Sequence, residues 1–432
     1  MLPMSTPAKR LRRRGVSSTF AMALCLAAAG LIGTVALDAP AQAQNKKSKD
    51  DGKPKNSKKF SEAYQPVAKI VNEEGGDYAS AKSMLPGVIA AVENDADRFF
   101  AGNLSLMLGN KLNDKALQRQ GLQMMVDSGQ TTPEQVGQFN FFIGNLAYDA
   151  KDYDAARTAL MAAKQAGYVD PNDNLDPLLA ETYFASGQAA QGVTFIEGLA
   201  KERKAAGQAV PDQWLLRALQ MAYNGKMNQE ANDLSVLLVS SNPTQKNWVA
   251  ALQVVNAINS LDPQAQLDLF RLMRETNSLT ERQEFVGYIE AADPRIMSNE
   301  VQKVLDAGVA AGALSASDEY YADVKRVVDT RKAQDRAEAP GLVKEAQGAA
   351  TGSKALSAGD VLLSLDENQQ AADMYQMAID KGGVDQQVAL TRLGIAKAKA
   401  GDYAGAREAL AKVTGPRQIV ARAWMAYVDG KA

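Results

Sequence analysis

The stretch AGDYAGAREAL, residues 400–410, has two relatives far upstream: GGDYASAKSML at 75–85 and AKDYDAARTAL at 150–160. All three contain Asp-Tyr-x-x-Ala. The alanines of the three copies are separated by 75 and 250 residues; they are Ala81, Ala156 and Ala406. Both separations are near multiples of about 36, so the spacing predicts intervening copies. The chain is therefore predicted to be built from repeats.

Two weaker copies fit the same period. Gly192 in ASGQAAQGVTFI lies 36 residues after Ala156, and Ala371 in LDENQQAADMYQMA lies 35 residues before Ala406. Four residues after the small residue of each copy comes a large side chain: Leu85, Leu160, Ile196, Tyr375 and Leu410. Twelve residues before it, most copies have another small residue: Gly144, Ala180, Gly359 and Gly394. Small residues where two helices cross allow close backbone approach, so the frame predicts antiparallel pairs of short helices.

The composition agrees with helices throughout. The chain is 46% hydrophobic and only 6% aromatic, and β-branched runs of strand length are scarce. Residues with high helix propensity dominate instead. The predicted fold class is therefore all-α, an α-solenoid of antiparallel helix pairs.

These motifs resemble the tetratricopeptide repeat, a pattern of Leu-Gly, Ala, a large apolar residue and a terminal Pro. One copy matches at Ile143, Gly144, Ala156, Leu160 and Pro171, and another at Leu393, Gly394, Ala406, Leu410 and Pro416. The resemblance is good over 139–243 and 354–416 and weak elsewhere. It implies that Tyr78, Tyr153 and Tyr403 begin second helices and pack across the hairpin turn.

The resemblance also implies a groove made by the first helices of successive pairs. By register the residues that project into it are Phe141, Asn145, Tyr148, Glu181, Phe184, Leu215 and Tyr223. Some members clamp a C-terminal carboxylate with a Lys and an Asn; here Asn145 is present but Phe141 replaces the Lys, so no such clamp is expected. An apolar, aromatic groove suits amphipathic or basic peptide segments. Alternatively, several of these side chains simply pack against the next repeat.

The absence of histidine and the scarcity of cysteine exclude several classes of catalytic and metal site. The chain has no histidine, and its only cysteine is Cys25. A Ser-His-Asp triad, imidazole acid–base catalysis and His-bound zinc are therefore excluded. No cofactor motif is present, and no cofactor is expected. The protein is predicted not to be an enzyme; a carboxylate-based glycan enzyme is the minor alternative.

One loop has the spacing of a calcium site. Oxygen-bearing side chains follow an EF-hand pattern in DPNDNLDPLLAE, residues 170–181. Leu175 stands where a Gly permits the sharp turn, however, and Pro171 and Pro177 stiffen the loop. The stretch is interpreted as a turn between repeats, and no metal is expected.

The N-terminus is typical of an export signal. A cluster of Lys and Arg over 9–14 precedes an apolar stretch, and Ala41 and Ala43 flank Gln42 in the small-x-small pattern of a cleavage site. Residues 1–43 are therefore predicted to be a signal peptide of the Sec type, cleaved near Ala43. The predicted location is periplasmic or secreted; an uncleaved anchor in the inner membrane is the alternative.

A Lys-rich segment follows the signal. Residues 44–59 hold many lysines and almost no apolar side chain, so they are predicted to form a disordered basic linker. Weak contact of residues 45–59 with an anionic membrane surface is possible on charge grounds. The rest of the chain is acidic, which argues against nucleic acid as a partner.

The remaining chain divides by how well it keeps the repeat frame. Residues 60–243 and 336–432 are predicted to be tetratricopeptide-like repeats, and 244–335 diverged helical repeats. The polar stretch over 333–357 is predicted as the boundary, with Pro340 beginning a helix.

The sequence therefore predicts a non-enzymatic scaffold of the cell envelope that binds peptide segments of protein partners in the groove of its first helices. The alternative is a structural subunit of an envelope assembly, such as secretion, polysaccharide or cell-wall machinery, that uses other surfaces.

Overall fold

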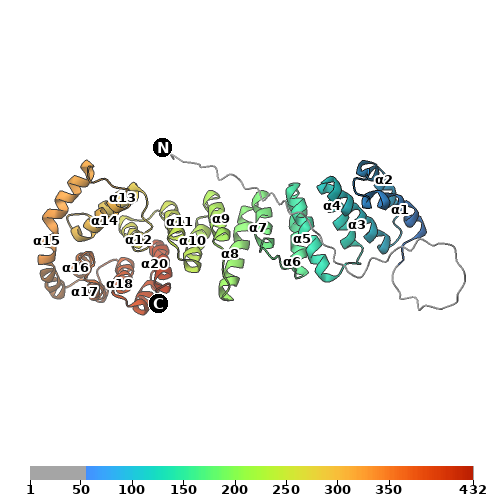
Figure 1. Cartoon of the computed structure of the whole chain (residues 1–432). Coiled ribbons are helices and arrows are strands. Elements are labelled where there is room, and N and C mark those ends of the chain that lie inside the picture. The colour runs from blue at the N-terminus through green and yellow to red at the C-terminus, as the bar shows by residue number, and fades with distance from the viewer. Residues whose placement is uncertain (1–54, 432) are drawn as a thin grey trace, which may run out of the picture. The chain divides into compact units, whose positions relative to one another are not determined.

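The computed structural model describes residues 55–431, and the residues from Lys55 onward form one compact unit. The predicted signal peptide and most of the predicted linker lie outside the described residues. No strand occurs over 55–431, which confirms the predicted all-α class. Consecutive helices pack as neighbours along the chain, as expected for an α-solenoid (Figure 1).

In chain order, the helices of residues 55–431 are α1 (Lys58–Asn72), α2 (Tyr78–Ala90), α3 (Asp95–Leu112), α4 (Lys115–Asp127), α5 (Pro133–Asp149), α6 (Tyr153–Gln165), α7 (Leu175–Ala185), α8 (Ala189–Ala205), α9 (Asp212–Asn224), α10 (Asn228–Ser241), α11 (Gln245–Ile258), α12 (Pro263–Glu275), α13 (Arg282–Ala292), α14 (Ser298–Ala310), α15 (Glu319–Gly348), α16 (Ser353–Ser364), α17 (Asn368–Lys381), α18 (Gln386–Ala400), α19 (Tyr403–Ala411), the 3-10 turn η1 (Gly415–Arg417) and α20 (Gln418–Asp429).

The Asp-Tyr pairs of the three strong copies lie at helix starts. Tyr78, Tyr153 and Tyr403 are the first residues of α2, α6 and α19. The aspartate before each tyrosine is the N-cap, and its side chain accepts a hydrogen bond from the backbone N–H three residues on. Such a cap satisfies an N–H that the helix leaves without a partner.

The glycines of the first helices lie where the paired helices touch. A Cβ atom on Gly144 would lie 2.6 Å from Cγ of Leu160, and one on Gly394 would lie 2.5 Å from Cγ of Leu410. Gly359 faces the ring of Tyr375 in the same way, at 2.6 Å. The second-helix residues Ala81, Ala156, Ala371 and Ala406 are fully buried, and Gly192 packs against Phe184.

Two sequence predictions about boundaries are corrected. The predicted helix start at Pro340 is wrong, because Pro340 lies inside the 30-residue helix α15. Buried side chains on both sides of it, including Asp335, Ala339 and Ala346, hold the helix to its neighbours through the proline. The predicted linker ends earlier than residue 59, because Ser57 caps α1 and Phe60 is fully buried.

Packing is continuous across the middle of the chain. One hydrophobic cluster of buried residues runs from Val239 to Val428. Among helices α1 to α11, each helix packs mainly against the helices one or two places away in the chain. Further on, α20 contacts α10 and α12, α18 contacts α12, and α16 contacts α14. The C-terminal helices therefore lie against helices from the middle of the chain.

Candidate partner-binding face

The predicted groove residues fall into two groups by burial. Phe141, Phe184 and Leu215 are buried in hydrophobic clusters, and Leu215 is 0% exposed. These three side chains pack between helices, so they offer almost no surface to a partner. Asn145, Tyr148, Glu181 and Tyr223 are half-buried or exposed, and the Tyr223 residue is 45% exposed.

The partly exposed residues lie around an arginine that was not among the predicted groove residues. Arg217 on α9 donates from Nε to Oε1 of Glu181 at 2.7 Å and from Nη2 to Oε2 at 3.0 Å. Its guanidinium also lies 5.4 Å from the ring centre of Phe184. The hydrogen bonds that Arg217 donates to Glu181 raise the pKa of Arg217. These contacts join the first helices α7 and α9.

We call this surface the N-terminal face; its residues are Asn145, Tyr148, Glu181, Arg217 and Tyr223. Two of them also contact their own helix pair: the Asn145 side chain donates to the carbonyl oxygen of Phe141, and the Tyr148 ring lies 5.5 Å from that of Tyr153. These contacts hold the two side chains in place. The face therefore presents aromatic rings and one bidentate ion pair.

An equivalent surface exists on the first helices near the C-terminus. Arg392 on α18 donates from Nη1 to both carboxylate oxygens of Asp360 on α16, at 2.9 and 2.7 Å. Like Arg217 with Glu181, this ion pair joins successive first helices, although one nitrogen of Arg392 contacts both carboxylate oxygens. We call it the C-terminal face; its residues are Asp360, Leu363, Arg392, Ala398 and Lys399.

The C-terminal face differs because helix α12 covers it. Arg392 also donates from Nη2 to Gln264, and its Nε forms an ion pair of 3.5 Å with Asp268; Gln264 and Asp268 are both on α12. Lys399 donates to Glu275 at the other end of α12, at 2.8 Å. As a result the Arg392 side chain is 1% exposed, whereas that of Arg217 is 42% exposed.

A buried ionic cluster continues from Arg392 into the core. Asp268 accepts from Arg271 at 2.9 Å and from Arg417, and Arg271 makes two further bonds of 2.9 Å to Glu300. Burial alone would raise the pKa of Glu300, but the attraction and hydrogen bonds of Arg271 hold it well below its ordinary value. A buried charge is tolerated only with such partners. The cluster therefore joins α12, α14, α18 and η1.

This cluster could not be predicted from the sequence because its members are far apart in the chain. Arg417 and Asp268 are separated by 149 residues, and Trp424, whose Nε1 donates to the carbonyl oxygen of Asp268, by 156. No local motif marks such a contact. The Arg217–Glu181 pair is different, because its separation of 36 residues equals one repeat period. That spacing could have predicted it.

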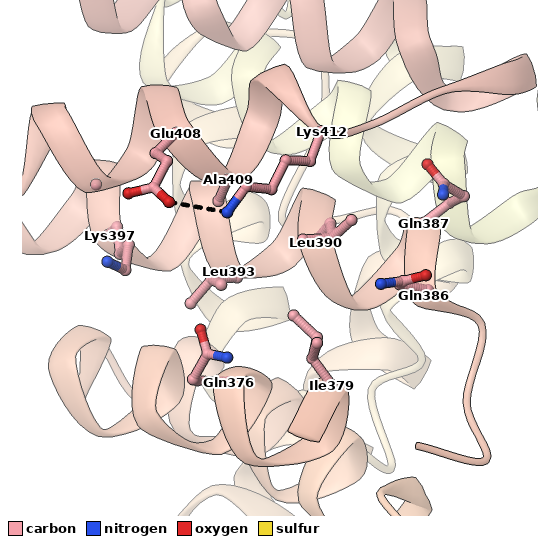
Figure 2. Close-up of a pocket in the computed structure, with 11 residues that line it drawn as sticks. Gln376, Ile379, Gln386, Gln387, Leu390, Leu393, Lys397, Glu408, Ala409 and Lys412 are labelled. Atoms are coloured by element: carbon pink, nitrogen blue, oxygen red, sulfur yellow. Dashed lines mark hydrogen bonds and ion pairs between the residues drawn. The ribbon is translucent and has the colours of Figure 1, made fainter. Parts of the chain in front are cut away.

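A shallow hollow of about 430 Å³ lies on the opposite side of the C-terminal pairs, between α17, α18 and α19 (Figure 2). Its floor is apolar, with Leu390, Leu393 and Ala409. Its rim is polar, and Lys412 there donates to Glu408 at 2.8 Å. Because α17 and α19 are second helices, this hollow is not part of the C-terminal face.

The geometry shows no centre for metal chemistry within the described part of the chain. No group of three acidic or sulfur ligands that could hold a metal ion occurs over 55–431. The carboxylates of the calcium-like loop have separate partners: Asp170 accepts from the backbone of Asn174, Asp176 from Lys164, and Glu181 from Arg217. Over the same residues no helix combines the length and apolarity needed to cross a membrane.

Comparisons with known proteins assign the chain to no family. No protein-family description matches the sequence, and no curated protein matches it. Among solved structures, one titled "Structure of Naa15/Naa10 bound to HypK-THB" is similar at a TM-score of 0.37 and 13% identity, over 83% of this chain and 60% of that chain. This chain thus spans about 60% of the length of that protein.

Proposed function

We propose that the protein is a non-enzymatic scaffold of the tetratricopeptide-repeat type that binds segments of protein partners on its N-terminal face. The observation that carries the proposal is the row of partly exposed side chains on three successive first helices: Tyr148 on α5, Glu181 on α7, and Arg217 with Tyr223 on α9. Tyr and Arg are enriched at binding hot spots because they combine apolar contact area with directed hydrogen bonds.

The direction of the shifted carboxyl pKa values favours a binding role over glycan chemistry. A general acid for glycoside cleavage needs a raised carboxyl pKa. In residues 55–431, the carboxyl groups whose pKa departs from its ordinary value depart downward; the most buried, Glu300, does so because of Arg271. Tyr288, whose pKa burial raises well above its ordinary value, is fully buried beside Glu300 in the ionic cluster.

Photo-crosslinking tests the binding face. A photoreactive amino acid replaces Tyr223 in the full chain, and in a control it replaces Arg326, an exposed residue of α15. Irradiation of intact cells, followed by mass spectrometry, should give a defined adduct from position 223 and not from 326. The double variant Tyr148→Ala/Arg217→Ala should reduce the adduct. Phe184 is left unchanged, because it packs against Gly192 and its loss would disturb the fold.

A second candidate function rests on the hollow between α17, α18 and α19. A structural subunit of an envelope assembly would use such a second-helix surface and leave the N-terminal face free. Reversing the charge of the exposed rim residue Lys412 with Lys412→Glu should then reduce assembly without disturbing the core, while Tyr148→Ala/Arg217→Ala should leave assembly intact. The reverse pattern supports the N-terminal face.

Export to the periplasm is part of the proposal and rests on the N-terminal sequence. The expected mature protein begins at Gln44, after cleavage behind Ala43. N-terminal sequencing of the protein from the envelope fraction tests this. An intact Met1 in the inner-membrane fraction would show an uncleaved anchor instead.

A further inference from the structure

We infer that the partner of the N-terminal face is an amphipathic helix that presents two oxygen-acceptor side chains, one turn apart, to Arg217, as α12 presents Gln264 and Asp268 to Arg392. The inference rests on the proposed function and specifies the partner's chemistry. Its basis is that the chain contains two copies of the same face, one covered and one open.

The two arginines occupy the same position of the repeat. Arg217 lies eleven residues before Asn228, the first residue of α10, and Arg392 lies eleven residues before Tyr403, the first residue of α19. Their carboxylate partners also correspond, because Glu181 lies eight residues before α8 and Asp360 eight residues before α17. The two ion pairs are therefore equivalent features of the array.

The covered copy shows what this surface binds. Along α12, Gln264 and Asp268 are four residues apart and so lie on one side of the helix. Both approach Arg392, and seven residues after Asp268 the carboxylate of Glu275 accepts from Lys399. The apolar residues of α12, including Leu267 and Leu272, are 0% exposed in the same cluster as Leu363 and Ala398. The occupant is thus a helix whose oxygen-bearing side chains at i and i+4 face the arginine among apolar side chains.

The open copy keeps the groups that would receive such a helix. Nε and Nη2 of Arg217 donate to Glu181, so the edge of the guanidinium that carries Nη1 is not used by this carboxylate. Arg392 uses its Nη1 for the carboxylate and its Nη2 for the amide of Gln264. Arg392 thus binds the neighbouring repeat through one nitrogen and a third helix through another. Arg217 uses two nitrogens for the neighbouring repeat and keeps Nη1 for a third helix.

The apolar part of the open copy is also exposed at the corresponding place. Tyr223 lies five residues before α10, and Ala398 lies five residues before α19. Tyr223 is 45% exposed, whereas Ala398 is 5% exposed within the cluster that includes α12. Because α12 meets α18 at both Arg392 and Lys399, a helix seated like α12 would lie along α9 and cover the ring of Tyr223. It would thereby remove apolar surface from water, which favours binding.

The test uses the chain's own α12 as the probe. A fluorescent peptide of residues 262–276, blocked at both ends, is titrated into the full chain and followed by anisotropy. Saturable binding is expected, with a dissociation constant on the order of 10 μM. Loss of one charge-assisted hydrogen bond should weaken it about tenfold, both for Arg217→Ala protein and for Gln264→Ala peptide. The two changes together should weaken it little more than either one alone.

Two control proteins accompany the titration. Arg326→Ala removes an exposed arginine of α15 and should bind the peptide as the unaltered chain does. Arg217→Lys keeps the charge but loses the planar fork, and it should also weaken binding. Unchanged circular dichroism of each variant shows that the fold is intact.

Three outcomes would overturn the inference. In the first, Arg217→Ala and the unaltered protein bind the peptide with equal affinity, which would place the peptide elsewhere. In the second, no binding occurs up to millimolar peptide. In the third, the chain dimerises and Arg217→Ala abolishes the dimer, which would make a second copy the occupant. The crosslink at position 223 distinguishes this failure from failure of the proposed function. A partner that crosslinks there without a helical segment leaves the binding role standing and removes only the helix.

Discussion

Arg217 and Arg392 occupy one position of the same repeat, yet the first lies at the surface and the second in the core. Each pairs with an acidic residue on the preceding first helix. The difference comes from α12, which lies against α18 and supplies Gln264 and Asp268 to Arg392. The repeat frame therefore builds the face, while a third helix determines whether the face is buried in the core or exposed to solvent.

Burial changes what the same ion pair contributes to stability. An exposed pair such as Arg217 with Glu181 is well hydrated when separated, so it contributes little, about 0–1 kcal/mol. A charge in the buried ionic cluster has no water to return to, and removing its partner leaves it uncompensated. The C-terminal half should therefore be far more sensitive to charge substitutions than the N-terminal half.

The largest expected effect is that of Asp268→Ala. This carboxylate is 0% exposed and contacts Arg271, Arg392 and Arg417. Its removal should lower the free energy of unfolding by about 3–5 kcal/mol, because three buried guanidinium groups lose a counter-charge. Urea unfolding followed by circular dichroism measures the change. A loss below about 1 kcal/mol would show that solvent reaches the cluster.

Overpacking at the helix crossings should cost the same in both halves. Gly144→Val and Gly394→Val each push a side chain into a fully buried leucine, Leu160 or Leu410. Overpacking of this kind costs about 1–3 kcal/mol. Similar losses in urea unfolding are expected for the two variants. A large difference between them would mean that the halves differ in the repeat itself and not only in its covering.

Acid should weaken the buried cluster through Glu300. The pKa of Glu300 is lower in the folded chain than in the unfolded one, so the unfolded state binds more protons below about pH 4.3. The Glu300 contribution to the free energy of unfolding is therefore present at neutral pH. It is lost progressively as the pH falls below about 4.3. Unfolding measured from pH 7 to pH 3 should show the loss, and Glu300→Gln should flatten the profile. A variant profile parallel to that of the unaltered chain would contradict this.

The sequence predicted the parts of the fold that depend on short separations. Gly144 and Leu160 are 16 residues apart, as are Gly394 and Leu410. Both residues of each helix-crossing contact therefore lie within one copy of the repeat. The Asp-Tyr helix starts are local in the same way. The long helix through Pro340 was not predictable from local pattern, because side chains of neighbouring helices hold it.

The site was only partly predictable for the same physical reason. Register placed Tyr148, Glu181 and Tyr223 on the first helices, but it could not separate exposed residues from Leu215, which neighbouring helices bury. The covering of the C-terminal face depends on α12, where the repeat frame has been lost. The predicted domain limits at 243 and 335 remain predictions, as does the signal peptide.

The most direct test of the central claim is a matched pair of substitutions, Arg217→Ala and Arg392→Ala, compared by urea unfolding of the full chain. Both remove an arginine from one repeat position, and both leave its acidic partner in place. Arg392→Ala should cost about 3 kcal/mol or more, because Asp360 and Asp268 lose a buried counter-charge, whereas Arg217→Ala should cost less than about 1 kcal/mol. Equal losses would contradict the account, since they would mean that α12 does not set the two faces apart.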